Sequence, residues 1–515
     1  MTPAPRHRHP VGAPLTIAVA LLAVVAGAVG SHLSPVVFAL CAVLLAVVVA
    51  YASLSWPRPA LVLVAISPIL DRYLAPGILS PEVEGLAHFL SEGMLLTVGV
   101  ALTAQAAKRG TLRAALWHPT SACALAFGVA TVASAVINPV PPAQAVAGAA
   151  FTLDAVAFFY LARMVGFDVR QAMIAIGAFI GLLALAALVA LGQAVLTPEL
   201  FGLYALQGRF GEIYRLASFF GDPNVFAALL SASVPFLLFG VPGLRTKRGR
   251  SWALALAALL ILALWLSFSR GGWLGAVVGF GLAAAILDRR ALAIGIVVGA
   301  ATFALAWVMP RDLLGGAGQR PDLVRSTWGR VDTIGGGRDL RILFVINGIP
   351  IVADHPALGV GPGRYGGAAA DIFGTDVYAE YDTDKLFINP AQRTVDNFWL
   401  HLLVETGVIG LAAFAGMVGV PLLQVFRGAM AALWARRVLL SGIAAAIIAL
   451  SVNGLTTMLL EANSVAFMFW FLLGIGSILA PPPAATESET DQTARLTASS
   501  PNAAETSQSS NATVR

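Results

Sequence analysis

Long apolar stretches recur along nearly all of the 515-residue chain, and this pattern limits its possible folds more than any other feature. A bilayer core about 30 Å thick requires about 20 apolar residues in a spanning helix. Stretches that reach or approach this length cover residues 15–30, 36–55, 60–70, 88–107, 121–137, 145–163, 171–195, 223–240, 252–268, 271–287, 291–309, 398–425, 438–458 and 463–479. Since 60–70 is short, we predict an all-α polytopic membrane protein with about 12–14 transmembrane helices. The low share of charged residues, 11%, excludes a soluble domain.

The basic residues between these stretches indicate the orientation of the chain. Lys and Arg concentrate in cytoplasmic loops because positive flanks resist translocation. If the N-terminus is inside, every short basic cluster falls on the cytoplasmic side, namely Arg58; Lys108, Arg109 and Arg113; Arg163 and Arg170; Arg245, Lys247, Arg248 and Arg250; Arg289 and Arg290; Arg427, Arg436 and Arg437. We therefore expect both termini in the cytoplasm. These clusters also explain the net charge of +5, so no nucleic-acid partner is expected.

This topology divides the chain into five segments. We expect a cytoplasmic N-terminal tail at 1–14, a transmembrane bundle at 15–309, a large extracytoplasmic loop at 310–395, C-terminal transmembrane helices at 396–480 and a disordered cytoplasmic tail at 481–515. The first apolar run could also be a signal peptide, but the second run follows almost at once and favours a spanning helix. Loops as long as 310–395 are uncommon unless functional, and residues 338–353 are predicted to form an amphipathic helix on the membrane surface.

Two arginines, Arg215 and Arg270, fall at the outward ends of apolar spans, where the topology rule least favours them. A charged residue kept at the edge of the hydrocarbon indicates a functional site. Guanidinium groups bind phosphate oxygens with two parallel hydrogen bonds, and the phosphates of a lipid-linked diphosphate lie at this depth. Alternatively, both arginines reach to lipid headgroups or pair with Glu212, Asp222 or Glu461.

The span that opens at Asp396 carries a second polar group. Asn397, His401 and Glu405 are four residues apart and therefore share one face of the predicted helix. A polar stripe in lipid must face a cavity or the bundle interior, so it forms either a substrate site or an interhelical hydrogen-bond ladder. Asp396 lies at the loop boundary and is the best-placed carboxylate for a general base.

Other polar residues give weaker indications. Asp154 lies in the middle of a span, and His88 and Glu92 are four apart in another, where structural pairing and an ion path would each explain them. The glycine-rich segment 359–363 is a weak candidate for a phosphate loop, since it lacks the Lys and Ser/Thr of a Walker motif. No sequence pattern typical of a metal site is present, and we expect neither a metal nor another cofactor.

Four ordered segments resemble the O-antigen ligase and O-antigen polymerase superfamily. They are residues 215–224 (RLASFFGDPN), 269–273 (SRGGW), Gly337-Arg338 leading to 354–363 (DHPALGVGPG), and 396–400 (DNFWL) continuing to 405–410 (ETGVIG). The resemblance covers about residues 205–412. It implies a bacterial multi-pass protein of the cytoplasmic (inner) membrane with a GT-C-like fold and an active site that faces the periplasm or the exterior.

The resemblance further implies a metal-independent glycosyltransferase that takes a glycan from undecaprenyl diphosphate and passes it to an acceptor hydroxyl on a glycan, lipid or protein. Arg215 and Arg270 would hold the diphosphate, with Asp396 as the base. Arg338, Arg341, His355, Asn397 and His401 would complete substrate binding. Ligases typically carry histidine at the position of Asp396, so the resemblance favours a polysaccharide polymerase over lipopolysaccharide ligation. The rival functions are a lipid-linked glycan transporter or flippase, a protein O-oligosaccharyltransferase, and a non-catalytic export scaffold.

Overall fold

The computed structural model describes residues 35–74, 90–196, 206–207, 214–308, 340–387 and 393–480. Several predictions fall outside these residues, among them the first span at 15–30, His88, Glu212, Arg338 and the tail at 481–515.

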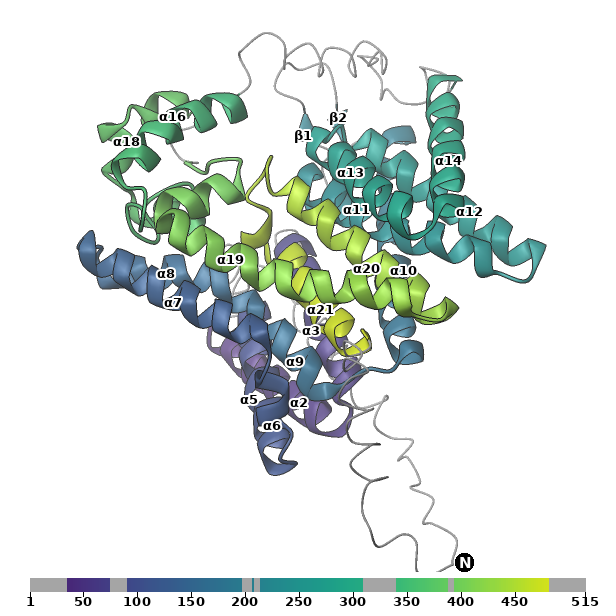
Figure 1. Cartoon of the computed structure of the whole chain (residues 1–515), viewed down its shortest axis with the longest axis horizontal. Coiled ribbons are helices and arrows are strands. Elements are labelled where there is room, and N and C mark those ends of the chain that lie inside the picture. The colour runs from purple at the N-terminus through teal and green to yellow at the C-terminus, as the bar shows by residue number, and fades with distance from the viewer. Residues whose placement is uncertain are drawn as a thin grey trace, which may run out of the picture.

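The regular secondary structure of the described residues is helical apart from one short antiparallel ladder, so the predicted all-α class is confirmed (Figure 1). The ladder pairs β1 (Leu206–Gln207) with β2 (Tyr214–Arg215). The longer helices are α2 (Pro35–Ser55), α3 (Pro57–Leu74), α5 (Leu90–Lys108), α7 (Pro119–Ile137), α10 (Val169–Val195), α11 (Pro223–Gly240), α12 (Lys247–Leu266), α13 (Arg270–Leu287), α14 (Arg289–Val308), α19 (Phe398–Ala431), α20 (Trp434–Asn453) and α21 (Asn463–Leu479).

Shorter helices connect or flank these long ones. They are α6 (Leu112–Leu116), α8 (Pro142–Leu153), η2 (Asp154–Val156), α9 (Ala157–Val165), η4 (Ser218–Phe220), η5 (Val241–Gly243), α16 (Leu340–Asp354), α17 (Ala368–Phe373), α18 (Val377–Glu380), η7 (Thr383–Leu386) and η8 (Leu459–Glu461).

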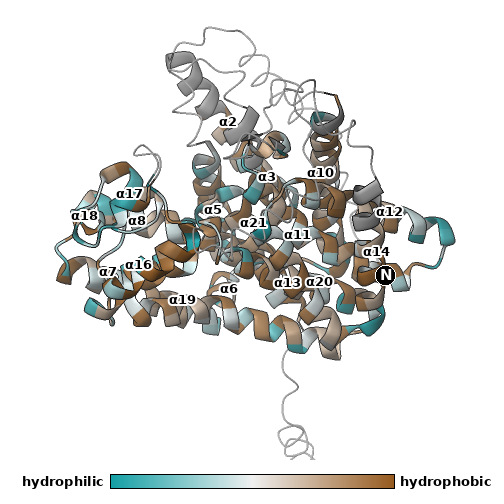
Figure 2. Cartoon of the chain, turned by 90° about the horizontal axis from the view of Figure 1, so that it is seen from above, coloured by the Kyte–Doolittle hydropathy of each residue, from teal (hydrophilic) through white to brown (hydrophobic). Residues whose placement is uncertain are grey.

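Seven helical stretches in the described residues are long and apolar enough to cross a membrane, by length and composition. They are Pro119–Ile137, Pro142–Val165, Val169–Gln193, Pro223–Gly243, Lys247–Leu266, Phe398–Ala431 and Trp434–Asn453. This result confirms a polytopic membrane protein. Figure 2 shows apolar residues over most of the bundle, while hydrophilic residues gather at its ends. The predicted total of about 12–14 spans stays a prediction.

Helix α20 lies in the middle of the bundle, where it packs against α11, α13 and α19 (Figure 1). Small residues permit this close approach, as is common between membrane helices. A Cβ at Gly275 would lie 2.7 Å from the Ala449 carbonyl oxygen, and one at Gly279 would lie 2.6 Å from the Ala449 nitrogen. The apolar side chains of α20 from Leu439 to Leu450 are mostly buried, so this part of the helix provides rigid support for the neighbouring helices.

Helices α16, α17 and α18 form a lobe at the upper left of Figure 1, next to the start of α19. The lobe has its own apolar core, which includes Phe344, Tyr365 and Tyr378. Helix α16 matches the helix predicted at 338–353 closely, but its apolar residues lie on two faces. Phe344 is buried against the lobe, whereas Ile346 and Ile349 are exposed.

Helix α19 is broken at Gly407, which has φ 64° and ψ −171°. The break brings the segment after α16 against the exposed helix backbone. Val408 N donates to Pro356 O (2.9 Å), and Val360 N donates to Val404 O (2.9 Å). Only a glycine fits here, because φ is positive and a Cβ would lie 2.3 Å from the Ala357 carbonyl carbon.

We therefore predict that Gly407→Ala destabilises the protein by at least about 2 kcal/mol, because it adds both backbone strain and a steric clash. Gly419→Ala is the matched control in the same helix, since a Cβ there meets nothing within 4 Å. This control should change stability by no more than about 1 kcal/mol. Thermal unfolding of both variants in detergent tests the prediction, and equal transition temperatures would contradict it.

Candidate active site

Arg215 lies against the start of α13, the helix that begins with Arg270. Arg215 Nε donates to Ser267 O (3.1 Å), and its Nη2 donates to Asn224 Oδ1 (2.8 Å). Asn224 Oδ1 also accepts from the Ser269 hydroxyl (3.0 Å), and Ser269 caps α13 through Gly272 N. This network places Arg215 beside the start of α13, the helix whose first residue is Arg270.

The backbone beside both arginines is strained. Ser218 has φ 53° and Phe268 has φ 48°, which is a left-handed conformation that is uncommon for residues other than glycine. Such conformations persist only where the surrounding structure enforces them, and they cluster at functional sites. Here both strained residues lie within three positions of a predicted phosphate-binding arginine.

The turn after α20 joins this network to the lobe. A Cβ at Gly271, next to Arg270, would lie 2.0 Å from Thr456 Oγ1. From the other side, Arg341 Nε donates to Thr456 O (2.7 Å), and Phe398 N donates to Gly454 O (2.8 Å). The starts of α13, α16 and α19 thus meet at residues 454–456, although they are far apart in the sequence.

Asp396 forms an ion pair with Arg341, with 3.4 Å between Oδ2 and Nη2. The Asp396 side chain is 47% exposed and that of Arg341 is 22% exposed. A pair this accessible contributes little to stability, about 1 kcal/mol or less. Its main effect is to orient the carboxylate beside Thr456 while leaving part of it open to a ligand.

His401 is 1% exposed and both of its ring nitrogens face oxygen atoms. Nδ1 lies 2.5 Å from Tyr365 O and 3.7 Å from Glu405 Oε1, while Nε2 lies 3.2 Å from Glu461 Oε1. The Nε2–Glu461 contact is an ion pair without a hydrogen bond. Because each nitrogen faces acceptors, the arrangement fits a protonated imidazole between two carboxylates.

The two carboxylates hold the segment that follows α16. Glu405 Oε2 accepts from Gly363 N and Glu405 Oε1 accepts from Tyr365 N, both at 2.8 Å. Glu461 Oε2 accepts from Ala368 N, also at 2.8 Å. Buried carboxylates require such compensation, and amide donors provide it. We call His401, Glu405 and Glu461 the latch.

The latch connects to Asp396 through the backbone. Gly366 O accepts from Val395 N (3.0 Å), directly before Asp396. Tyr378 OH accepts from Gly366 N (2.7 Å) and donates to Arg393 O (2.9 Å). Burial raises the pKa of the Tyr378 phenol well above its ordinary value, so the hydroxyl stays protonated and can make both bonds.

The glycine-rich segment 359–363 serves this packing and is not an open phosphate loop. Each of its four amide N–H groups has an acceptor: His355 O for Gly359, Val404 O for Val360, Glu405 O for Gly361 and Glu405 Oε2 for Gly363. Pro362 has no N–H. The sequence showed the glycines but not the acceptors in α19, which lie more than forty residues further along the chain.

The remaining predicted residues have different surroundings. Asn397 caps α19, with its Oδ1 accepting from Leu400 N (3.0 Å), so it supports the helix directly beneath Asp396. His355 is half-buried after α16, and its carbonyl accepts from Gly359 N. Thr456 and Asn224 were missed as site residues, although Asn224 lies within the quoted motif after Asp222 and Pro223.

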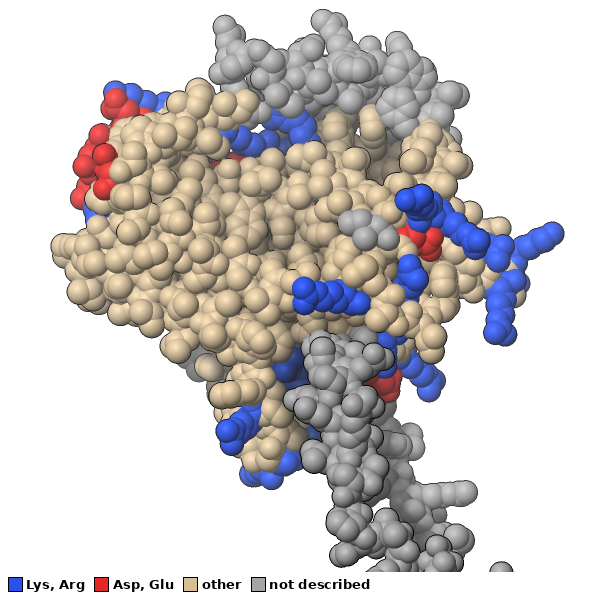
Figure 3. All heavy atoms as spheres, viewed as in Figure 1, with Lys and Arg blue, Asp and Glu red and all other residues tan. Residues whose placement is uncertain are grey.

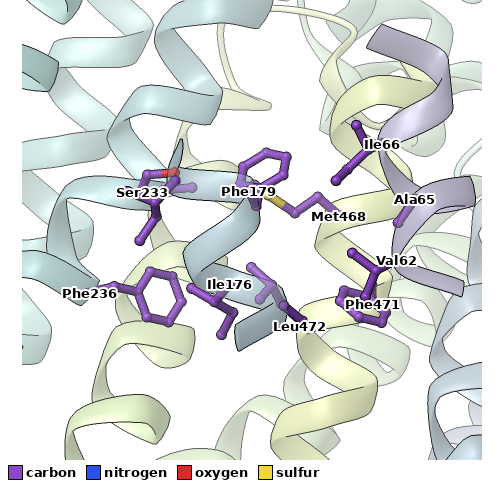
Figure 4. Close-up of a pocket in the computed structure, with 13 residues that line it drawn as sticks. Val62, Ala65, Ile66, Ile176, Phe179, Ser233, Phe236, Met468, Phe471 and Leu472 are labelled. Atoms are coloured by element: carbon purple, nitrogen blue, oxygen red, sulfur yellow. The ribbon is translucent and has the colours of Figure 1, made fainter. Parts of the chain in front are cut away.

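Asp154 lies next to the latch. It begins the 3-10 break η2 between α8 and α9, close enough to Glu92 and Glu461 for electrostatic interaction. A separate crevice between α3, α10, α11 and α21 is apolar (Figure 4). Its one hydroxyl, of Ser233, donates to Leu229 O, so the crevice offers no group for phosphate chemistry.

Figure 3 shows a hollow at the top of the molecule, where Lys and Arg atoms gather between the lobe and the helices at the upper right. Further Lys and Arg atoms lie at the bottom and along the right edge, away from the lobe.

Residues 253–415 match a family model described as O-antigen ligase. The match contains Arg270, Arg341, Asp396 and the latch residues of α19, and it confirms the resemblance seen in the sequence motifs. A comparison with curated proteins gave no match.

We predict that Glu405→Gln loosens the segment at 363–368. One carboxylate oxygen becomes an amide group that faces an N–H donor, which should cost about 1–3 kcal/mol of stability. Glu380→Gln is the control, since this glutamate is exposed in the same lobe. Hydrogen exchange at Gly363 and Tyr365 should accelerate in the first variant alone, and unchanged exchange would show that the latch does not hold this segment.

Proposed function

We propose that this chain, which carries an O-antigen ligase domain at residues 253–415, transfers a glycan from undecaprenyl diphosphate to an acceptor hydroxyl. The reaction would take place at the outer face of the bacterial cytoplasmic membrane and would not require a metal. One connected arrangement carries the proposal. Arg215 binds the turn before α13, the start of α13 packs against Thr456, and Arg341 joins Thr456 to Asp396.

In this proposal Arg215 and Arg270 bind the diphosphate of the donor. The bond between the anomeric carbon and the phosphate oxygen breaks, and negative charge develops on the leaving diphosphate. The Arg215 guanidinium, already fixed by Ser267 and Asn224, stabilises that charge without reorganising. Long lipid and glycan portions of the substrate bring the anomeric carbon into line for attack.

Asp396 then acts as the general base. It accepts the proton of the acceptor hydroxyl while the acceptor oxygen forms the new bond to the anomeric carbon. Arg341 orients the carboxylate, and the exposed half of Asp396 leaves room for an incoming hydroxyl. Since a carboxylate stands where ligases of the superfamily typically have histidine, we favour polymerisation of an exported polysaccharide over ligation.

A transporter of lipid-linked glycans is the second candidate. Asp154 at the break between α8 and α9 favours it, because discontinuous helices near charged residues are typical of transporters. Reconstituted protein distinguishes the two functions. Transport of the donor across vesicles without a new glycosidic bond would support the transporter and refute the transferase.

We predict that Arg215→Ala and Arg270→Ala each reduce glycan transfer about 10²–10³-fold, because each removes a donor to the developing charge. Lys385→Ala provides the control, since it removes a highly exposed cation of the lobe and should leave the rate within about twofold. The assay follows surface glycans in a strain that lacks the chromosomal gene. Full activity of both arginine variants would contradict the proposal.

The strain that lacks the gene also distinguishes the two kinds of enzyme. If the enzyme is a polymerase, loss of the gene should reduce a laddered polymer to single repeat units. If it is a ligase, lipid-linked polymer should accumulate.

Asp396→Asn should reduce the rate about 10²–10⁴-fold with little change in donor affinity, because the amide cannot accept the proton. Asp384→Asn, in η7 of the same lobe, is the control. Initial rates and donor KM of purified variants provide the measurement. If Asp396→Asn keeps the full rate, another group must be the base.

A further inference from the structure

A second basic hollow lies where η5, the α13–α14 junction and the start of α20 meet. Its lining consists of Pro242, Gly243, Leu287, Asp288, Arg289, Arg290, Trp434 and Arg437. It belongs to the set of basic loops that the sequence places on the cytoplasmic side, and none of its residues takes part in the candidate active site. Lys and Arg atoms lie along the right edge of Figure 3, remote from the lobe.

The positive charge of this hollow is poorly compensated. Asp288 is its one carboxylate, and Oδ1 accepts from the backbone nitrogens of Arg290 (2.9 Å) and Ala291 (3.4 Å) as the cap of α14. Arg437 donates to Leu287 O. Among the described residues, Arg289, Arg290 and Arg437 form no ion pair with a carboxylate. Three guanidinium groups gathered in this way favour an anion with several acceptor oxygens.

An apolar rim borders the same hollow. A Cβ at Gly243 would lie 1.9 Å from Trp434 Nε1, so the glycine lets the indole pack closely against η5. Trp434 is 45% exposed and Leu433 is 88% exposed. Tryptophan at this position is typical of a membrane–water interface. A free phosphate ion would gain nothing from this rim, whereas the acyl chains of a lipid would cover it.

We propose that the hollow binds the phosphate-bearing headgroup of an anionic phospholipid in the cytoplasmic leaflet. Arg289, Arg290 and Arg437 contact the phosphate, and Trp434 and Leu433 contact the glycerol and the first part of the acyl chains. Basic pockets between membrane helices on the cytoplasmic side recognise such headgroups. The site is independent of glycan transfer, so either proposal can fail without the other.

Purified full-length protein titrated with short-chain phosphatidylglycerol tests the site, with phosphatidylcholine and inorganic phosphate as parallel probes. Arg289→Ala/Arg290→Ala should weaken phosphatidylglycerol binding about tenfold or more. Lys247→Ala/Arg248→Ala removes the same charge from exposed residues at the start of α12, outside the hollow, and should change binding less than threefold. Both pairs are exposed, and thermal unfolding verifies that each variant is folded.

Each result has a defined meaning. Selective weakening by the first pair, with weak phosphatidylcholine binding and no competition by millimolar phosphate, supports the proposal. Equal weakening by both pairs would reveal a diffuse basic surface and overturn it. Competition by inorganic phosphate at the lipid's own concentration would identify a phosphate-ion site and also overturn it, as would equal binding of phosphatidylcholine or unchanged binding by the first pair.

Discussion

The break of α19 at Gly407 and the buried Glu405 before it determine how the segment after α16 packs against α19. A continuous helix would use its own carbonyl groups and would leave no acceptors for another segment. With the break, the carbonyls of Val404 and Glu405 accept from the segment after α16, and the Glu405 carboxylate binds two further amides. Because an unpaired buried carboxylate is very costly, these amide contacts stabilise the Glu405 carboxylate in its buried position.

The candidate active site follows from that packing. The latch holds the backbone at Tyr365 and Gly366 in place. The Gly366 carbonyl then binds Val395 N, and the ion pair with Arg341 orients the next residue, Asp396. On the other side, capping of α13 by Ser269 fixes Arg270 relative to Arg215 through Asn224. The turn at residues 454–456 joins the two halves. Chemistry on a lipid-linked donor needs such fixed charges, because preorganised groups stabilise developing charge more effectively than mobile ones.

The sequence predicted most helices because hydropathy and length control membrane spans directly. It also predicted that Arg215 and Arg270 matter, since an arginine at the wrong end of a span has few structural explanations. It could not predict that His401 and Glu405 are occupied by the loop, because their partners come from a distant segment and depend on one positive φ at Gly407. The Arg341–Asp396 pair was missed for the same reason. Helix α16 was predicted to be amphipathic, but the structure places aliphatic residues on both its buried face and its exposed face.

In the proposed function, Arg215 and Arg270 stabilise the diphosphate as its bond to the sugar breaks. The decisive experiment incubates purified protein with an undecaprenyl-diphosphate-linked glycan and an acceptor, and measures both products by mass spectrometry. We expect equal amounts of released undecaprenyl diphosphate and of glycan joined to the acceptor. Intact donor after prolonged incubation with folded protein, or release of lipid without a new glycosidic bond, would contradict it.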